Sequence, residues 1–245
     1  MADRFFADPQ LAAFYEPLHP RASRDDFAFY LPLVMKAPSA LDVGCGDGGL
    51  FRLARESGHK GRLCGLDPAR GILEIARRRA DVEWVLGDLR EAAWDREFHL
   101  AIMTGHAFQV LIEDAEIECA LAAVRQALVG EGRFAFETRN PRARAWEQWT
   151  PENAVDFTDR QDRRARMSTQ VDNVEGEIVS FTHTFTREDW SAPQESKSTL
   201  RFLDADAIAA ALAKAGLKME RQYGDWDRSD LRADSPEIIT LARRA

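Results

Sequence analysis

The chain has 245 residues, of which 45% are hydrophobic and 30% charged, a composition typical of a globular protein and not of a disordered one. Its formal net charge of -8 argues against a surface that neutralises many phosphates, so we expect no DNA partner and disfavour RNA. The three cysteines are too widely spaced for a disulfide framework, and no leader or long apolar stretch is evident, which predicts a cytoplasmic protein without membrane contact.

Two helical segments are predicted between residues 7 and 36, because apolar side chains recur at three- and four-residue spacing on both sides of His19-Pro20. The first segment carries the apolar series Leu11, Phe14, Tyr15 and Leu18. We interpret residues 1–38 as an N-terminal helical cap.

From residue 40 onward, short apolar runs alternate with amphipathic helical patterns, which is typical of a parallel sheet covered by helices. Strands are predicted at 40–43, 62–66, 82–86, 98–103, 133–137, 217–223 and 238–242. Helices are predicted from about residue 50, at 69–79, 113–129 and 205–215, and Gly130-Glu131-Gly132 is expected to stop the third of them. The pattern therefore predicts an α/β fold with a doubly wound, seven-stranded, mostly parallel sheet.

A different pattern occupies residues 141–202. Residues 167–174 and 177–187 alternate apolar and polar side chains around a turn predicted at 173–176, and a further strand is predicted at 195–202. Such alternation favours antiparallel strands with one covered face. We therefore interpret 141–202 as a small antiparallel β insertion after the fifth strand, expected to cap the substrate. Residues 39–140 and 203–245 are assigned to a cofactor-binding core.

A glycine-rich turn follows the first predicted strand. Gly44, Cys45 and Gly46 lie between this strand and the next helix, where glycines let the backbone turn tightly and approach a ligand at a helix N-terminus. The turn also satisfies the dinucleotide-binding pattern through Gly49, and taken alone it fits a cofactor loop and a packing turn equally well.

Two acids follow at the ends of the next two predicted strands. Asp67 ends the second strand, where a carboxylate can accept both hydroxyls of an adenosine ribose. Asp88 follows the third strand, and its carboxylate is a suitable partner for the adenine amine. Each acid alone fits a helix cap equally well. Together with the glycine turn and with Asp42 in the first strand, they predict a nucleoside cofactor at the carboxyl edge of the sheet.

At this point the chain resembles the class I, Rossmann-like S-adenosylmethionine-dependent methyltransferases. Residues 41–46 are similar to the first motif of that family, Asp67 to its ribose acid, and Gly87-Asp88 to its adenine-side motif. The resemblance covers residues 39–138 and 203–245, although Asp47-Gly48-Gly49 stands where the family more often has Thr-Gly or Ser-Gly.

The resemblance implies S-adenosyl-L-methionine as cofactor and S-adenosyl-L-homocysteine as product. Tyr15 and Tyr30 resemble tyrosines that close over the methionine part of the cofactor, although their helical spacing fits core aromatics equally well. The full set of expected cofactor-binding residues is Tyr15, Tyr30, Asp42, Gly44, Cys45, Gly46, Asp67, Pro68, Gly87, Asp88, Leu89, Thr104, Gly105 and His106.

The end of the fourth predicted strand is the expected reaction edge. His106 is the candidate general base there, because its ordinary pKa lies near neutral pH; a ligand-lining or structural role is the alternative. Methyl transfer depends mainly on alignment, so a dedicated base is optional. The scattered histidines lack metal-ligand spacing, and no metal is expected. Candidate substrate contacts are Glu137, Arg139, Asn140 and Trp226.

We therefore expect methyl transfer to N or O of a small-molecule metabolite, by a monomer or homodimer. The chain resembles small-molecule N-methyltransferases in which a β element after the fifth strand covers the pocket. The alternatives are an RNA or protein methyltransferase, a non-catalytic cofactor-binding regulatory module, and a dehydrogenase.

Overall fold

The central element is a mixed sheet of seven strands in the order β10-β11-β5-β4-β1-β2-β3. The computed structural model describes residues 2–244, so Met1 and Ala245, at the outer ends of the expected cap and core, lie outside the described residues. Strands β1 to β5 are parallel, whereas β11 runs antiparallel to both β5 and β10. The predicted α/β fold is confirmed. The strands are β1 (Ser39–Val43), β2 (Arg62–Asp67), β3 (Glu83–Leu86), β4 (Phe98–Met103), β5 (Leu128–Arg139), β10 (Leu217–Tyr223) and β11 (Glu237–Arg244).

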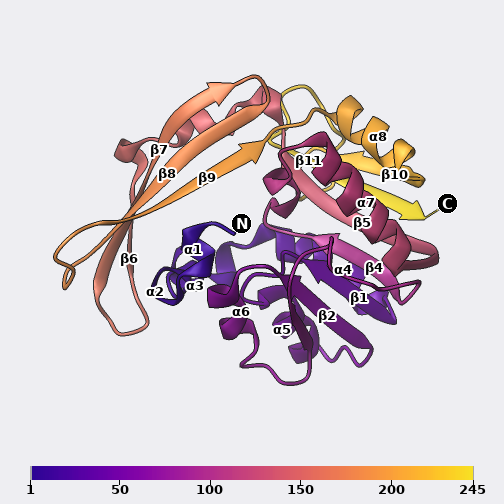
Figure 1. The fold of residues 1–245 in the computed structure, drawn as a ribbon, viewed down its shortest axis with the longest axis horizontal. Coiled ribbons are helices and arrows are strands. Elements are labelled where there is room, and N and C mark those ends of the chain that lie inside the picture. The colour runs from indigo at the N-terminus through magenta and orange to yellow at the C-terminus, as the bar shows by residue number, and fades with distance from the viewer. Residues whose placement is uncertain (1, 245) are drawn as a thin grey trace.

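Helices cover both faces of this sheet (Figure 1). One face packs against α7 (Asp114–Ala127) and α8 (Ala205–Lys214), and the opposite face against α4 (Asp25–Lys36) and α5 (Gly49–Glu56). Helix α6 (Arg70–Ala76) follows β2 and packs toward the N-terminal helices. A short 3-10 helix η2 (Ala107–Val110) follows β4.

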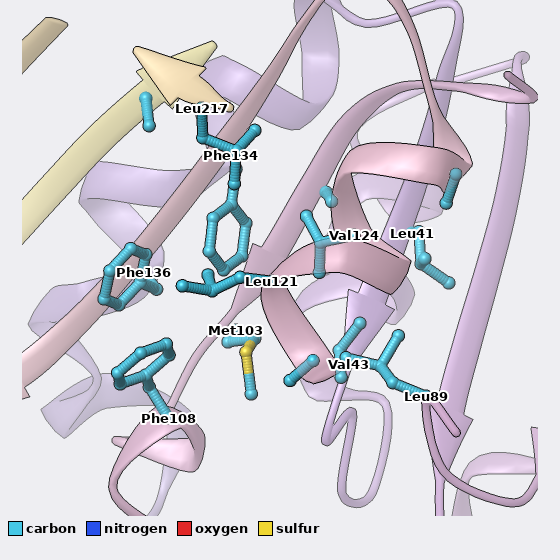
Figure 2. Close-up of a cluster of buried hydrophobic side chains, with 14 of the residues drawn as sticks. Leu41, Val43, Leu89, Met103, Phe108, Leu121, Val124, Phe134, Phe136 and Leu217 are labelled. Carbon is cyan, nitrogen blue, oxygen red and sulfur yellow. The ribbon is translucent and has the colours of Figure 1, made fainter. Parts of the chain in front are cut away.

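Alternate residues of each strand enter different hydrophobic clusters, as the two-residue period of a strand requires. Leu41 and Val43 of β1 pack under α7, together with Phe134 and Phe136 of β5 (Figure 2). Ala40 of β1 packs on the other face, under α4 and α5. By the same alternation, the even-numbered Asp42 lies on the α4 side of the sheet.

A second sheet of four antiparallel strands is inserted after β5, in the order β6-β7-β8-β9. It arches away from the core, and the N-terminal helices lie beneath it (Figure 1). Its covered face packs on those helices through Ala165 and Phe185, which contact Phe5 and Phe14. The segment contains η3 (Pro141–Ala143), η4 (Ala145–Gln148), η5 (Pro151–Asn153), β6 (Val155–Thr158), β7 (Arg164–Glu175), β8 (Ile178–Arg187) and β9 (Gln194–Arg201).

The N-terminal prediction was wrong in detail. In place of one helix before His19, the chain forms α1 (Arg4–Ala7), α2 (Pro9–Ala12) and α3 (Tyr15–Leu18), and η1 (Arg21–Ser23) precedes α4. The first break has a local cause, because the Asp8 carboxylate caps α2 by accepting from the backbone N–H of Gln10, at 2.8 Å, and Pro9 occupies the first turn of α2.

Some boundaries also differ from the prediction, and one short strand was missed. Helix α7 ends at Ala127 because Leu128 is already extended and pairs with Phe98, so the predicted glycine stop lies inside β5 as an irregularity in register. The β7-β8 turn is Gly176-Glu177 and not residues 173–176. Strand β6 escaped prediction because it is short and mostly exposed, with only Phe157 packing inward, on Phe14.

Candidate functional site

The glycine turn between β1 and α5 is held tightly against the neighbouring strand and loop. The backbone N–H groups of Gly44 and Cys45 both donate to the carbonyl oxygen of Leu66, at 2.8 and 3.1 Å. Gly44 has φ +74°, and a Cβ added there would lie 2.8 Å from the Cβ of Ala107. A side chain at Gly44 is therefore excluded by both the backbone conformation and the loop after β4.

Asp67 lies directly against this turn. Its Oδ2 accepts from the N–H of Gly46 and its Oδ1 from the N–H of Ala69, both at 2.8 Å. The backbone carbonyl of Asp67 accepts from the N–H of Gly87, at 3.1 Å. The turn, Asp67 and Gly87 thus share one rim of the sheet, and each Asp67 oxygen keeps further acceptor capacity. Burial raises the pKa of Asp67, and its two backbone hydrogen bonds oppose that shift.

Asp42 and Asp88 have contrasting environments. Asp42 is 1% exposed, and its Oδ1 has no hydrogen-bond partner among residues 2–244. Burial, followed by the nearby Asp67 carboxylate, raises the pKa of Asp42 well above its usual range. Asp88 is more exposed and pairs with Arg90 at 2.5 Å, which lowers its pKa. The orphaned Asp42 oxygen is an unused acceptor close to the glycine turn, so these residues fit a polar ligand there.

Arg24 and Asp26 are additional polar residues beside the turn that sequence reasoning missed. The Arg24 guanidinium pairs with Asp26 through bonds of 2.8 and 2.6 Å, and it donates to the Tyr15 hydroxyl at 3.2 Å. A cavity of about 20 Å³ lies between Tyr15, Arg24 and the start of α5 at Gly49. No local pattern identifies Arg24, because its contact with Tyr15 joins two segments on either side of η1.

A buried hydrogen-bond network joins α4 to the loop after β4. The Tyr30 hydroxyl donates to Glu137 Oε2, and Glu137 Oε1 accepts from the backbone N–H of His106 at 2.8 Å. The His106 Nε2 lies 3.0 Å from both carboxyl oxygens of Glu237 at the start of β11. Tyr30 and Glu137 are both fully buried, and their hydrogen bonds hold the backbone at His106 in place.

Burial controls the protonation of this network. It lowers the pKa of His106 to about 3, with the Arg139 charge adding to the effect, and it raises the pKa of Glu237 to about 8. The pair therefore shares one proton at neutral pH. Glu237 was missed in the sequence, although its place directly before an apolar final strand marks the sheet edge.

Arg139 ends β5 next to this network. Its Nη1 donates to Gln109 Oε1 at 3.2 Å, and its guanidinium lies 5.3 Å from the ring centre of Trp149. Arg139 pairs in register with Glu237 across β5 and β11, and by the two-residue alternation it shares the face of Glu137. The rim thus brings three of the expected residues together: His106, Glu137 and Arg139.

Three other expected residues, Asn140, Trp226 and Leu89, make hydrogen bonds or packing contacts within the fold. The Asn140 amide donates to the carbonyls of Ala233 and Ser235, and Trp226 packs near Phe29 and Tyr30. Leu89 points into the core under α7 (Figure 2). The remaining expected residues lie on or beside the rim: Cys45 and Thr104 are buried, whereas Pro68 and Gly105 are exposed.

One further surface feature lies outside this rim. A surface hollow of about 410 Å³, between the start of α7 and the β7-β8 hairpin, contains none of the expected site residues. Within residues 2–244, no group of three or more histidine, cysteine or acidic side chains is arranged to hold a metal ion. No helix in the same range is both long and apolar enough to cross a membrane.

The sequence matches known methyltransferases over the core. Residues 40–132 match a family described as a methyltransferase domain. A 2-phytyl-1,4-naphtoquinone methyltransferase of Thermosynechococcus vestitus is 36% identical over 117 residues, which are 45% of this chain and 51% of that protein. The chain therefore spans about half the length of this curated relative.

Solved structures match over nearly the whole chain. The CcbJ methyltransferase from Streptomyces caelestis has a TM-score of 0.76 at 18% identity, covering 100% of both chains. The S-adenosylmethionine-bound CalS10, an amino pentose methyltransferase from Micromonospora echinaspora, has a TM-score of 0.69 at 21% identity, covering 95% of both. At these identities the likeness concerns the fold. The expected fold is confirmed: residues 40–132 match a methyltransferase domain, and the chain has the Rossmann-like fold of these solved methyltransferases.

Proposed function

We propose that this chain is an S-adenosylmethionine-dependent methyltransferase that methylates N or O of a small molecule. The observation that carries the proposal is the position of Asp67, a buried carboxylate bonded to the glycine turn at Gly46 and joined through its backbone to Gly87. Such an arrangement suits a nucleoside whose ribose hydroxyls donate to the carboxylate at the carboxyl end of the sheet.

The rim residues have distinct proposed roles toward this cofactor. Asp67 accepts from the ribose hydroxyls, Asp88 from the adenine amine, and the orphaned Asp42 Oδ1 from a donor near the glycine turn. Tyr15, held by Arg24, borders the methionine part, whereas Tyr30 acts through Glu137, to which its hydroxyl is already bonded. The bound cofactor supplies an electrophilic methyl group on a sulfonium.

His106 is the proposed general base, oriented by Glu237. Once the pair has lost its shared proton, Nε2–H donates to the Glu237 carboxylate and the Nδ1 lone pair is free. Nδ1 can then take the proton that the acceptor N–H or O–H releases as it bonds to the methyl group. Because the pKa of Glu237 is raised to about 8, this form gains population as the pH rises toward 8.

The two remaining parts of the chain are proposed to cover the acceptor. Residues 1–38 form a helical cap and 141–202 a β cap, while 39–140 and 203–245 bind the cofactor. The amino pentose methyltransferase CalS10 shares this overall layout, and the net charge of -8 disfavours a nucleic-acid substrate. The three free cysteines agree with a cytoplasmic location.

Calorimetric titration with S-adenosylhomocysteine tests the cofactor site. We expect binding to the wild-type chain and a loss of about 10- to 100-fold in affinity for Asp67→Ala, the range for losing hydrogen bonds to a charged group. Asp81→Ala is the matched control, because Asp81 is a surface acid 53% exposed. Unchanged affinity in Asp67→Ala would remove the ribose assignment, and binding of NADH instead would indicate a dehydrogenase.

A further inference from the structure

We infer that the methyl acceptor carries an anionic oxygen group, a carboxylate or a phosphate, that binds the Arg139 guanidinium beneath the β cap. The inference rests on the proposed methyltransferase function and specifies the substrate class of the same site. It follows from the contacts that Arg139 makes, from those that its neighbours make, and from its position beside His106.

Arg139 differs in its partners from two other partly buried arginines, Arg24 and Arg201. Arg24 pairs with Asp26 at 2.6 Å, and Arg201 pairs with Asp114 at 2.7 Å. Arg139, within the described range 2–244, has no carboxylate oxygen within 4.0 Å, and its hydrogen bonds are to the neutral amide oxygen of Gln109. A guanidinium keeps its charge inside proteins, so a buried one without a carboxylate is costly unless a ligand supplies the anion.

Glu137 and Glu237, the two acids on the same sheet face as Arg139, form contacts with other groups. Glu137 accepts from the Tyr30 hydroxyl and the His106 backbone N–H, and Glu237 contacts the His106 ring. Burial also raises the pKa of both carboxyl groups, which weakens their negative charge at neutral pH. An incoming anion therefore meets a guanidinium that no carboxylate of residues 2–244 neutralises by direct contact.

The surroundings of Arg139 belong to all three parts of the fold. Trp149, from the β cap, lies over the guanidinium and itself packs against Phe181 of β8. The Arg139 charge also helps to lower the pKa of His19, after α3, and of His183 in β8. The guanidinium thus lies where the core, the N-terminal helices and the cap meet.

The same position sets the geometry of the substrate. His106 follows β4 and Arg139 ends β5, and these strands are neighbours in the sheet. Adjacent strands lie about 4.8 Å apart, so a molecule of metabolite size can reach both residues. A planar guanidinium binds a carboxylate or phosphate through two parallel N–H bonds, which would fix the acceptor atom relative to His106.

Anion titrations of the protein saturated with S-adenosylhomocysteine test this subsite. Sodium acetate and inorganic phosphate are titrated separately by calorimetry at low ionic strength, and saturable 1:1 binding is expected for at least one. Acetate binding identifies a carboxylate, and phosphate binding a phosphate. In Arg139→Gln the affinity should fall at least about tenfold, the loss typical of one charge-assisted contact. Arg142→Gln, an exposed residue three positions on, is the matched control and should bind as the wild type.

The variants also separate the two proposals. S-adenosylhomocysteine should bind Arg139→Gln and Arg139→Lys as it binds the wild type, and Arg139→Lys, which keeps the charge, should retain measurable anion binding. If S-adenosylhomocysteine fails to bind the wild type, the proposed function is wrong. The anion titrations are then repeated without S-adenosylhomocysteine, and they still test whether Arg139 binds an anion. Absence of both anions from the wild type, or equal affinity in Arg139→Gln, would overturn the inference.

Discussion

The two sheets of this protein differ in how much of their surface is buried. Strand β1 of the core sheet is buried along its whole length, because helices cover both faces. Strand β7 of the β cap is mostly exposed, and its covered side depends on the N-terminal helices. The core sheet is therefore stabilised by apolar contacts on two faces, whereas the cap packs mainly through one apolar layer against the N-terminal helices.

The cap also contains charged pairs. Asp159 is 6% exposed and pairs with Arg163 at 2.8 Å and with Arg187 at 3.5 Å. Arg187 also lies 4.7 Å from the ring centre of Trp190. These contacts tie the ends of the cap strands together, where the core relies on apolar side chains. Three experiments test this difference, beginning with the largest expected effect.

Truncation of a core aromatic should be the most destabilising change. Phe134 is 0% exposed and stacks on Phe136 at 4.7 Å (Figure 2), so Phe134→Ala should lower the free energy of unfolding by about 3–5 kcal/mol. Val155 on the cap edge is 45% exposed, and Val155→Ala should change it by less than about 0.5 kcal/mol. Urea unfolding followed by circular dichroism measures both, and equal losses would contradict the contrast between the two regions.

Acid stability should depend on the cap histidine His183. Burial lowers its pKa from 6.5 to about 4, so the unfolded chain binds the extra proton first. The stability it contributes is complete above pH 6.5 and is lost as the pH falls from 6.5 toward 4. We expect a loss of about 1–2 kcal/mol, because partial exposure screens part of the roughly 1.4 kcal/mol per pKa unit.

The core pair His106 and Glu237 should behave differently in the same range. Between pH 6.5 and 4.5 the pair holds one proton when folded, and the unfolded residues together also hold one, so it adds no slope. Its contribution falls only as the pH rises from 6.5 toward 8 or drops from 4.5 toward 3. His183→Asn should therefore flatten the stability profile between pH 4.5 and 6.5, and an unchanged slope in that variant would argue against the buried state of His183.

The smallest effect is expected for an exposed ion pair of the cap. Arg166 and Asp156 lie 3.1 Å apart on β7 and β6, with side chains 51% and 74% exposed. Solvent screening and side-chain entropy leave such pairs a coupling of at most about 0.5 kcal/mol. A double-mutant cycle with Arg166→Ala and Asp156→Ala measures it, and a coupling above about 1 kcal/mol would mean that the cap surface is more rigid than the exposure indicates.

The sequence by itself determined the parts of this protein that obey short-range rules. The alternation of apolar runs and helices predicted all seven strands of the core sheet, and the bounds of two strands, Phe98–Met103 and Leu217–Tyr223, were predicted without error. The glycine turn and Asp67 were found because a strand end, a turn and an acid occur at fixed positions along the chain. The break in the N-terminal helix, where Pro9 begins α2, was missed. The edge strand β6 was missed because its periodic signal is short.

Only the tertiary structure decided which side chains meet at the rim of the core sheet. His106 meets Glu237 although 131 residues separate them, and Tyr30 meets Glu137 across 107 residues. Asn140 and Trp226, equally good candidates in the sequence, turned out to be held by structural contacts. No local pattern encodes such pairings, because they depend on β4, β5 and β11 lying side by side in the sheet. This arrangement brings side chains together irrespective of their distance along the chain.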